Sequence, residues 1–233
     1  MTDFSKVCEF NKCFDFPVHD DLSDKKCLKL RIDLIYEELN ELKIAYEKND
    51  LIEQMDACAD ILYVCYGMAY TYNCNSDKYF AEHYYLHDCN ATLFHRFKFE
   101  HLNYKEFIDN VLFHNFNDLV EATTNDLKTT LKCLHQLIFN VYAFQKLLNF
   151  DSDKIFDLVH SSNMSKLCQN IQEAEATVDK YAKYYVEYKS PYDSPYYYQL
   201  PNGLYVVKNR STGKALKSIN YTLVKLDHTY FIK

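Results

Sequence analysis

The sequence predicts an all-α protein, a helical bundle with a small β-hairpin extension at its C-terminal end. Only 3 Gly and 4 Pro occur in 233 residues. Because these residues mark turns and interrupt regular structure, such a low content favours helices over a sandwich, barrel or Rossmann fold. Several long segments place apolar residues at helical spacing. After Ser190 the residue composition changes: the turn-rich segment PYDSPYYYQLP is followed by a segment rich in strand-forming residues.

Two long helices are expected first, joined as an αα-hairpin by a short turn at Asn49-Asp50. The first is predicted from about Ser23, as N-cap, to about Asn49. The second is predicted over roughly 51–73. The first helix carries its apolar residues on one stripe, formed by Leu28, Ile32, Ile35, Leu39, Leu42 and Tyr46.

The rest of the chain is predicted as an entry segment, further helices and the hairpin. Residues 1–20 form the entry segment, and the hairpin turns at Ser211-Thr212-Gly213. This pattern predicts two domains, an all-α domain over 1–189 and a connector with hairpin over 190–233. Within the first domain, residues 74–150 are predicted to be a divergent or inserted helical region. The further helices are expected at 104–121, 126–149, from Asp151 toward His160, and at 165–188.

Composition excludes several classes of function. The formal net charge is -7 and no basic tract occurs, which argues against a nucleic acid polymer as partner. No segment is apolar for long enough to cross a membrane, so no membrane association is expected. The nine cysteines form no CxxC pair, and we expect a cytoplasmic protein with reduced thiols.

The second helix carries three acids on an otherwise apolar surface. Glu53, Asp56 and Asp60 lie at spacings of three and four, within roughly 60° on a helical wheel. Gly67 falls on the same stripe. A helix that is apolar almost all round is normally buried, and buried carboxylates are costly unless they are paired or hold a metal. The stripe therefore indicates a cation site.

The first helix carries a second acidic set, in YEELNEL. Glu37, Glu38 and Glu41 share a surface beside apolar neighbours. If the two helices pack antiparallel, both sets of carboxylates face each other and offer hard oxygen ligands to Mg²⁺. A glutamate not fully committed to metal could then act as general base. The alternative for an EExxE pattern alone is a solvated helix face.

These motifs resemble the all-α nucleoside triphosphate pyrophosphohydrolase superfamily, which includes the MazG proteins, the dimeric dUTPase-like enzymes and the phosphoribosyl-ATP pyrophosphohydrolases. The EExxE helix followed by the ExxD helix carries the resemblance. Further segments are similar to the subgroup in which SNMSK follows the metal helices. They are FNKCF at 10–14, VHSSNMSKL at 159–167, EAEATVDKY at 173–181 and STGKALKSINY near the C-terminus.

The resemblance implies an enzyme, a hydrolase that cleaves a (d)NTP between its α and β phosphates to give the (d)NMP and pyrophosphate. It implies a Mg²⁺ cofactor, with Mn²⁺ as a substitute, and a homo-oligomer, dimer or tetramer. The small-molecule substrate would be a nucleotide, such as dUTP or dCTP in house-cleaning. The base would be one of Glu37, Glu38 and Glu41, and the metal ligands would be Glu38, Glu41, Glu53, Asp56 and Asp60.

Four further residues are candidates for substrate contact. Lys166 offers a cation to phosphate and Asn163 a donor and an acceptor to base or sugar. Arg31 lies two turns before Glu38 on the same side, where it could pair with that acid or reach phosphate, and Asn11 could contact the base.

Two other functions stay open, phosphoribosyl-ATP pyrophosphohydrolase and, in another class, a non-catalytic nucleotide-binding helical scaffold. Other signals are set aside. STGK at 211–214 lacks the upstream glycine of a P-loop. His83 and His87 have a zinc-compatible spacing, but no second ligand pair is evident.

Overall fold

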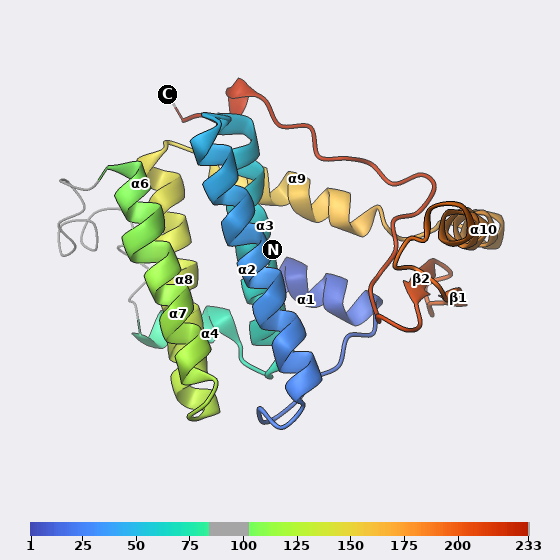
Figure 1. The fold of residues 1–233 in the computed structure, drawn as a ribbon, viewed down its shortest axis with the longest axis horizontal. Helices are drawn as coiled ribbons and strands as arrows, with labels where there is room; N and C mark the ends of the chain where they lie inside the picture. The colour runs from blue at the N-terminus through green and yellow to red at the C-terminus, as the bar shows by residue number, and fades with distance from the viewer. Residues whose placement is uncertain (84–102, 233) are drawn as a thin grey trace. The chain divides into compact units, whose positions relative to one another are not determined.

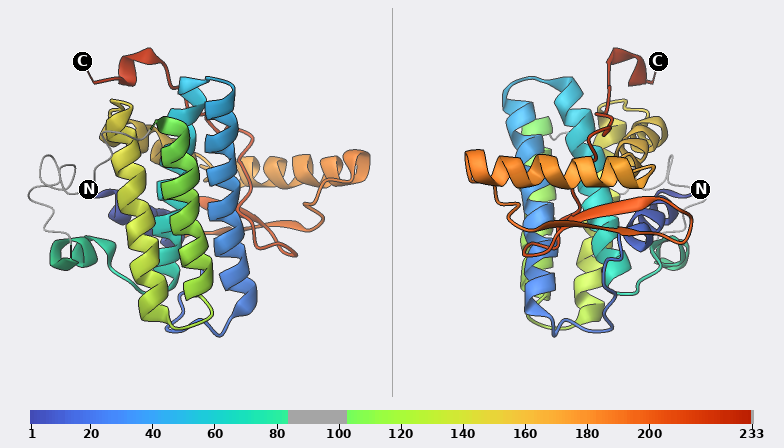
Figure 2. Two further views of the ribbon diagram at one scale, coloured as in Figure 1. Left: turned by 60° about the vertical axis from the view of Figure 1, so that its left-hand side comes forward. Right: turned by 90° about the vertical axis from the view of Figure 1, so that its right-hand side faces the viewer.

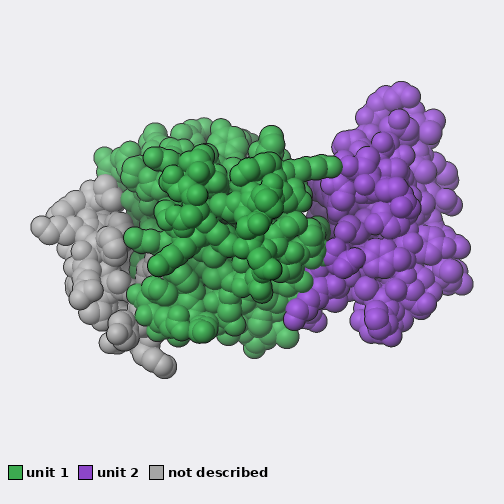
Figure 3. Space-filling view, turned by 90° about the horizontal axis from the view of Figure 1, so that it is seen from below, with its two compact units in different colours: residues 1–8, 16–157, 226–233 green, residues 9–15, 158–225 purple. Residues whose placement is uncertain are grey.

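The computed structural model describes residues 1–83 and 103–232 (Figure 1). In these ranges helices dominate and a single two-stranded sheet lies near the C-terminal end, which confirms the all-α prediction. Across the same ranges, no helix combines the length and apolar character needed to span a bilayer. The chain divides into two compact units (Figure 3): unit 1 holds residues 1–8, 16–157 and 226–233, and unit 2 holds residues 9–15 and 158–225.

Unit 1 is built on four long helices that run side by side, as both views of Figure 2 show. Helix α2 packs on α3, α3 on α8, α8 on α7, and α7 back on α2, so the four helices close a bundle. The helices are α2 (Lys25–Glu47), α3 (Leu51–Thr71), α7 (Phe113–Ala122) and α8 (Leu127–Leu147).

Capping residues set the starts of helices α2 and α3 and the turn between them. Asp24 caps α2, because its carboxylate accepts from the backbone N–H groups of Lys26 and Cys27. The expected cap Ser23 is therefore wrong by one residue; its N–H donates to Asp21 instead. Asp50 caps α3, and Asn49 before it adopts a left-handed φ of 53°, so the predicted turn at Asn49-Asp50 is confirmed.

Helix α3 is the central element of the bundle. Most of its residues are buried, including Met55, Cys58, Ile61 and Leu62, which are fully enclosed. The apolar stripe of α2, with Ile35, Leu39 and Leu42 all at 0 % exposure, packs on it. Burial of this kind is the main source of helix stability in proteins, because isolated helices are marginal in water.

The remaining helices of unit 1 include the predicted helix at 104–121 and a helix within the entry segment. The former is continuous from α6 (Tyr104–Phe107) through a π-helical turn (Ile108–Leu112) into α7, and Asp109 in that turn pairs with Lys43 of α2. Within the entry segment predicted over residues 1–20, helix α1 (Asp3–Cys13) places Phe4 and Val7 in the core. Helix α4 (Ser76–His83) follows α3.

Unit 2 contains the end of α9 (Ser152–Met164), α10 (Ile171–Tyr188) and the hairpin of β1 (Pro195–Gln199) with β2 (Tyr205–Asn209). Helix α10 starts later than the expected residue 165, because α9 continues to Met164 and Asn170 then caps α10. The predicted domain boundary at 189/190 falls within unit 2 and stays a prediction.

The hairpin exists but its turn lies one strand earlier than predicted. Strands β1 and β2 pair antiparallel, with Tyr197 opposite Val207, across a turn that contains Gly203 at a φ of 88°. The predicted turn at Ser211-Thr212-Gly213 does reverse the chain, yet only an isolated bridge between Lys208 and Ala215 follows. The segment PYDSPYYYQLP, which was predicted as a connector, therefore contains strand β1, and its tyrosines form that strand.

Candidate active site

The antiparallel packing of α2 on α3 sets which residues meet. At one end the side chain of Gln54 lies 3.5 Å from the carbonyl oxygen of Ala45. Toward the other end the guanidinium of Arg31 lies over Gly67, where an added Cβ would stand 3.1 Å from Nη1. Glu38 on α2 and Asp60 on α3 lie between these two contacts along both helices, so this register places them opposite each other.

The pKa of Glu38 reflects the closeness of the carboxylates on α2 and α3. Its side chain is half-buried, and burial together with the charges of Asp60, Glu41, Glu37 and Asp56, in that order, raises its pKa to about 8. Burial penalises the charged form, and each nearby like charge adds to that penalty. Glu38 therefore keeps its proton at neutral pH, an unusual state for a carboxyl group and one typical of functional sites.

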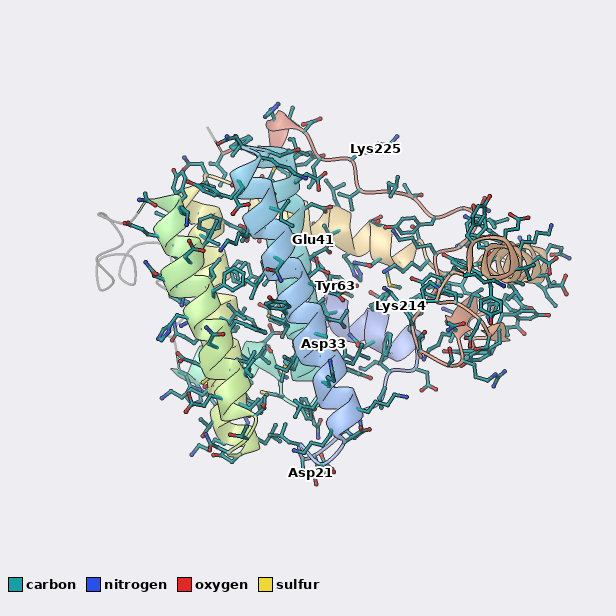
Figure 4. All side chains as sticks on the ribbon, viewed as in Figure 1. Asp21, Asp33, Glu41, Tyr63, Lys214 and Lys225 are labelled. Carbon is teal, nitrogen blue, oxygen red and sulfur yellow. The ribbon has the colours of Figure 1, made fainter. Side chains whose placement is uncertain are left out.

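The two acidic sets thus come together, with one residue at the margin. Glu37 and Glu41 are exposed on α2, Asp56 and Asp60 are half-buried on α3, and all four act on Glu38. Figure 4 labels Glu41 and Asp33, which lie on the same helix two turns apart. Glu53 is exposed in the first turn of α3, one turn before Asp56.

The donors fit a hard divalent cation by chemistry, but their side chains are not gathered into a ligand cage. Within residues 1–83 and 103–232, no three His, Cys, Asp or Glu side chains come close enough to hold a metal ion. The set nevertheless consists of carboxylates alone, which suits Mg²⁺, and burial together with repulsion from the other carboxylates raises the pKa of Glu38. Because Glu37 and Glu41 are exposed, their side chains can turn inward at little cost in packing.

Arg31 occupies a buried position at the Gly67 end of the helix pair. Its guanidinium carbon lies 5.4 Å from the ring centroid of Phe16, and the thiol of Cys27 accepts a hydrogen bond from it. Burial lowers the pKa of Arg31. Gly67, which continues the acidic stripe of α3, leaves the space that this side chain fills.

The other three substrate candidates belong to unit 2, whereas Arg31 and all six acids belong to unit 1. Lys166 donates from Nζ to Oδ1 of Asn163 at 2.5 Å, and the same Nζ lies 5.3 Å from the ring centroid of Phe10. Asn11, the residue after Phe10, is buried. The FNKCF and SNMSK segments, read separately in the sequence, are thus in contact.

The signals set aside in the sequence take other roles. His83 hydrogen-bonds through Nδ1 with the carbonyl of Tyr79, and His87 lies outside the described residues. The STGK segment forms the turn after β2, where the N–H of Gly213 donates to the carbonyl of Asn209, and no helix follows it as in a P-loop. Of the tyrosines, Tyr197 and Tyr205 pack against the core of unit 2.

Comparison with known proteins places this geometry in a family. The phosphoribosyl-ATP pyrophosphohydrolase family (PRA-PH) matches residues 7–83, a range that includes both acid-bearing helices. The chain is 34% identical over 248 residues to the uncharacterized protein L479 of Acanthamoeba polyphaga mimivirus, covering 95% of this chain and 93% of the relative. No solved structure matches the chain significantly. The helical fold, the paired acidic helices and these matches identify the chain as a member of the L479 family and of the all-α nucleoside triphosphate pyrophosphohydrolase superfamily.

Proposed function

We propose that the protein is a Mg²⁺-dependent nucleoside triphosphate pyrophosphohydrolase that converts a (d)NTP to the (d)NMP and pyrophosphate, with dUTP or dCTP as substrate in nucleotide house-cleaning. One observation carries the proposal. The pKa of Glu38 is raised to about 8 by burial and by four carboxylates from two helices. Loss of the Glu38 proton is therefore costly in the folded protein without metal, and a divalent cation would offset that cost.

The acids divide into two tasks in this proposal. Glu38, Glu41, Glu53, Asp56 and Asp60 would hold Mg²⁺, and the ion when bound would lower the pKa of water and neutralise charge on the phosphates. Glu37 or Glu41, exposed on α2, would accept the proton of the attacking water if not engaged as a ligand. Glu38, which is protonated at neutral pH without metal, would give up its proton as the ion binds.

The phosphates of the substrate would bind at the acids of unit 1, through Mg²⁺. Arg31 would meet a phosphate, since a guanidinium binds phosphate oxygens through paired donors. Lys166 and Asn163, which are hydrogen-bonded to each other, stay candidates by resemblance for contacts to phosphate and to base or sugar, and Asn11 for a contact to the base. By resemblance to the superfamily, we also propose that the protein forms a homo-oligomer, either a dimer or a tetramer.

The test is a screen for pyrophosphate release over all common NTPs and dNTPs, with and without Mg²⁺. The protein is removed by filtration before excess Mg²⁺ and inorganic pyrophosphatase are added, so that detection of phosphate does not depend on the metal in the reaction. Release of pyrophosphate only in the samples with Mg²⁺ is expected. Turnover of no nucleotide, or equal turnover in the metal-free samples, would refute the proposal.

Two variants assign the site. Glu38→Gln and Asp56→Asn are expected to lower kcat by 100-fold or more while the helical circular dichroism spectrum is unchanged, as is common when charge stabilisation is removed. Glu47→Gln and Asp33→Asn are matched controls, because Glu47 is exposed at the end of α2 and Asp33 pairs with Lys29 on the same helix. Full activity of either site variant would remove its residue from the site.

The second candidate is phosphoribosyl-ATP pyrophosphohydrolase, favoured by the family that matches residues 7–83. Phosphoribosyl-ATP is therefore included in the screen, and a kcat/KM for it above that for every nucleotide would select this function. Nucleotide binding without pyrophosphate release would instead favour a non-catalytic scaffold.

A further inference from the structure

The C-terminal tail of unit 2 (residues 217–222) is joined by side-chain hydrogen bonds to the SNMSK segment (residues 162–166), which comprises the end of α9 and the turn after it. The hydroxyl of Ser162 hydrogen-bonds with that of Tyr221 and contacts the carbonyl of Thr222, each at 2.8 Å. The hydroxyl of Ser165 accepts from the backbone N–H of Thr222 at 2.9 Å. Two motifs that lie more than fifty residues apart in the sequence, SNMSK and KSINY, therefore form one structure.

The tail reaches this point along a path that is fixed at each step. The N–H of Lys217 donates to the hydroxyl of Tyr181, and the hydroxyl of Ser218 donates to the buried carboxylate of Glu173. The N–H of Ile219 donates to Thr177 Oγ1. Three residues of α10 therefore hold the tail immediately before Tyr221, which limits the positions that the Tyr221 side chain can take.

The chain directly after the SNMSK segment is bound to the hairpin. Cys168 and Tyr205 of β2 exchange two backbone hydrogen bonds, each 2.8 Å long. Ser162 and Ser165 are thus fixed by the tail, and Cys168 is fixed by β2. Asn163 and Lys166, which are hydrogen-bonded to each other, lie between these attachment points.

We propose that Tyr221, acting through Ser162, is a positioning residue for the substrate contacts of Asn163 and Lys166. This inference rests on the proposed function, because it assumes that these two side chains bind the nucleotide. A side chain that is held in its bound geometry loses less conformational entropy on binding, and that gain appears as affinity. Loss of these hydrogen bonds should therefore raise KM and leave kcat unchanged, because none of the acids is altered.

The test uses the full-length protein and the nucleoside triphosphate with the highest kcat/KM in the screen. Tyr221→Phe removes only the hydroxyl and keeps the ring that Lys217 contacts at 4.5 Å. It is expected to raise KM about tenfold, which equals about 1.4 kcal/mol of binding free energy, without changing kcat. Ser162→Ala should raise KM at least as much, because it removes the bond with the Tyr221 hydroxyl and also the contact with the Thr222 carbonyl. The double variant should be no worse than Ser162→Ala, because the Tyr221 hydroxyl has then already lost its partner. Ser162→Thr, which keeps a hydroxyl, should restore most of the affinity.

Tyr185→Phe is the matched control, since Tyr185 is exposed on α10 and lies outside the tail and the SNMSK segment. If wild type turns over nucleotide, an unchanged KM in Tyr221→Phe would overturn the inference. Effects of the two single variants on KM that add in the double variant would overturn it as well. A lower melting temperature with unchanged KM would overturn it too, because the tail would then serve stability alone. Failure of the proposed function is seen separately, in wild type that turns over no nucleotide, and it would overturn both.

Discussion

Gly67 of α3 and Arg31 of α2 share one space in the helix pair, since a Cβ at Gly67 would lie 3.1 Å from Nη1 of the guanidinium. The acidic stripe of α3 thus ends at a residue without a side chain, and a buried cation fills the place. Gly is normally costly within a helix, by about 1 kcal/mol relative to Ala. Its presence in the interior of the central helix is explained by the room that Arg31 needs.

This relationship predicts a coupling between the two positions. In wild type, Gly67→Ala should lower the free energy of unfolding by up to about 1 kcal/mol, because displacement of a buried guanidinium outweighs the gain in helix propensity. In an Arg31→Met background the same change should raise it by up to about 1 kcal/mol. Urea denaturation of the four proteins measures both effects. Equal effects of Gly67→Ala in the two backgrounds would show that the contact is not limiting.

The raised pKa of Glu38 predicts how stability changes with pH in the absence of metal. Between the ordinary pKa near 4.5 and the folded-state value of about 8, the folded protein binds more protons than the unfolded chain, so stability falls as pH rises through this window. The slope approaches roughly 1.4 kcal/mol per pH unit. We therefore expect urea midpoints to fall from pH 6.5 to pH 7.5.

Glu38→Gln should remove this slope, and so should saturating Mg²⁺, because the cation offsets the charges of Asp60, Glu41, Glu37 and Asp56. Glu47→Gln, an exposed change on the same helix, should leave the slope as in wild type. A wild-type stability that is flat over this range without metal would contradict the protonated state of Glu38.

His135 predicts the opposite trend at acid pH. The side chain is fully buried, its Nδ1 lies 2.7 Å from the carbonyl of Leu131 and its Nε2 lies 3.0 Å from the hydroxyl of Ser76. A neutral ring with its proton on Nδ1 satisfies both bonds. Burial, the largest cause, lowers the pKa of His135 to about 4. Stability should therefore be lost as pH falls below the ordinary value of 6.5 toward 4.

The loss should amount to roughly 2 kcal/mol between pH 6.5 and 4.5. Urea denaturation in a Glu38→Gln background isolates the effect, because the titration of Glu38 changes stability with the opposite sign across that window. His135→Gln should be less stable at pH 7, since it loses buried packing and hydrogen bonds, but its stability should depend less on pH. The same acid slope in His135→Gln would assign the loss to other groups.

Much of the fold was predictable because the signals are local. Helical spacing of apolar residues predicted α2, α3 and α8 within a few residues, since the period of a helix appears directly in sequence. The errors arose where local signals compete. Ser23 and Asp24 are both good caps, and hydrogen-bond geometry selects Asp24. Tyrosines after Pro195 favour a strand as much as a connector, and pairing with Val206 and Val207 decides for the strand.

By itself, the sequence determined that two helices carry carboxylates on defined faces and that a short turn makes those helices antiparallel neighbours, because both follow from periodicity and a tight connection. Only the tertiary structure decided that Glu38 keeps its proton, that Arg31 fills the space over Gly67 and that Ser162 is fastened to Tyr221. These are contacts between distant parts of the chain, and their energies depend on burial and on separations of a few ångströms, which no local pattern encodes.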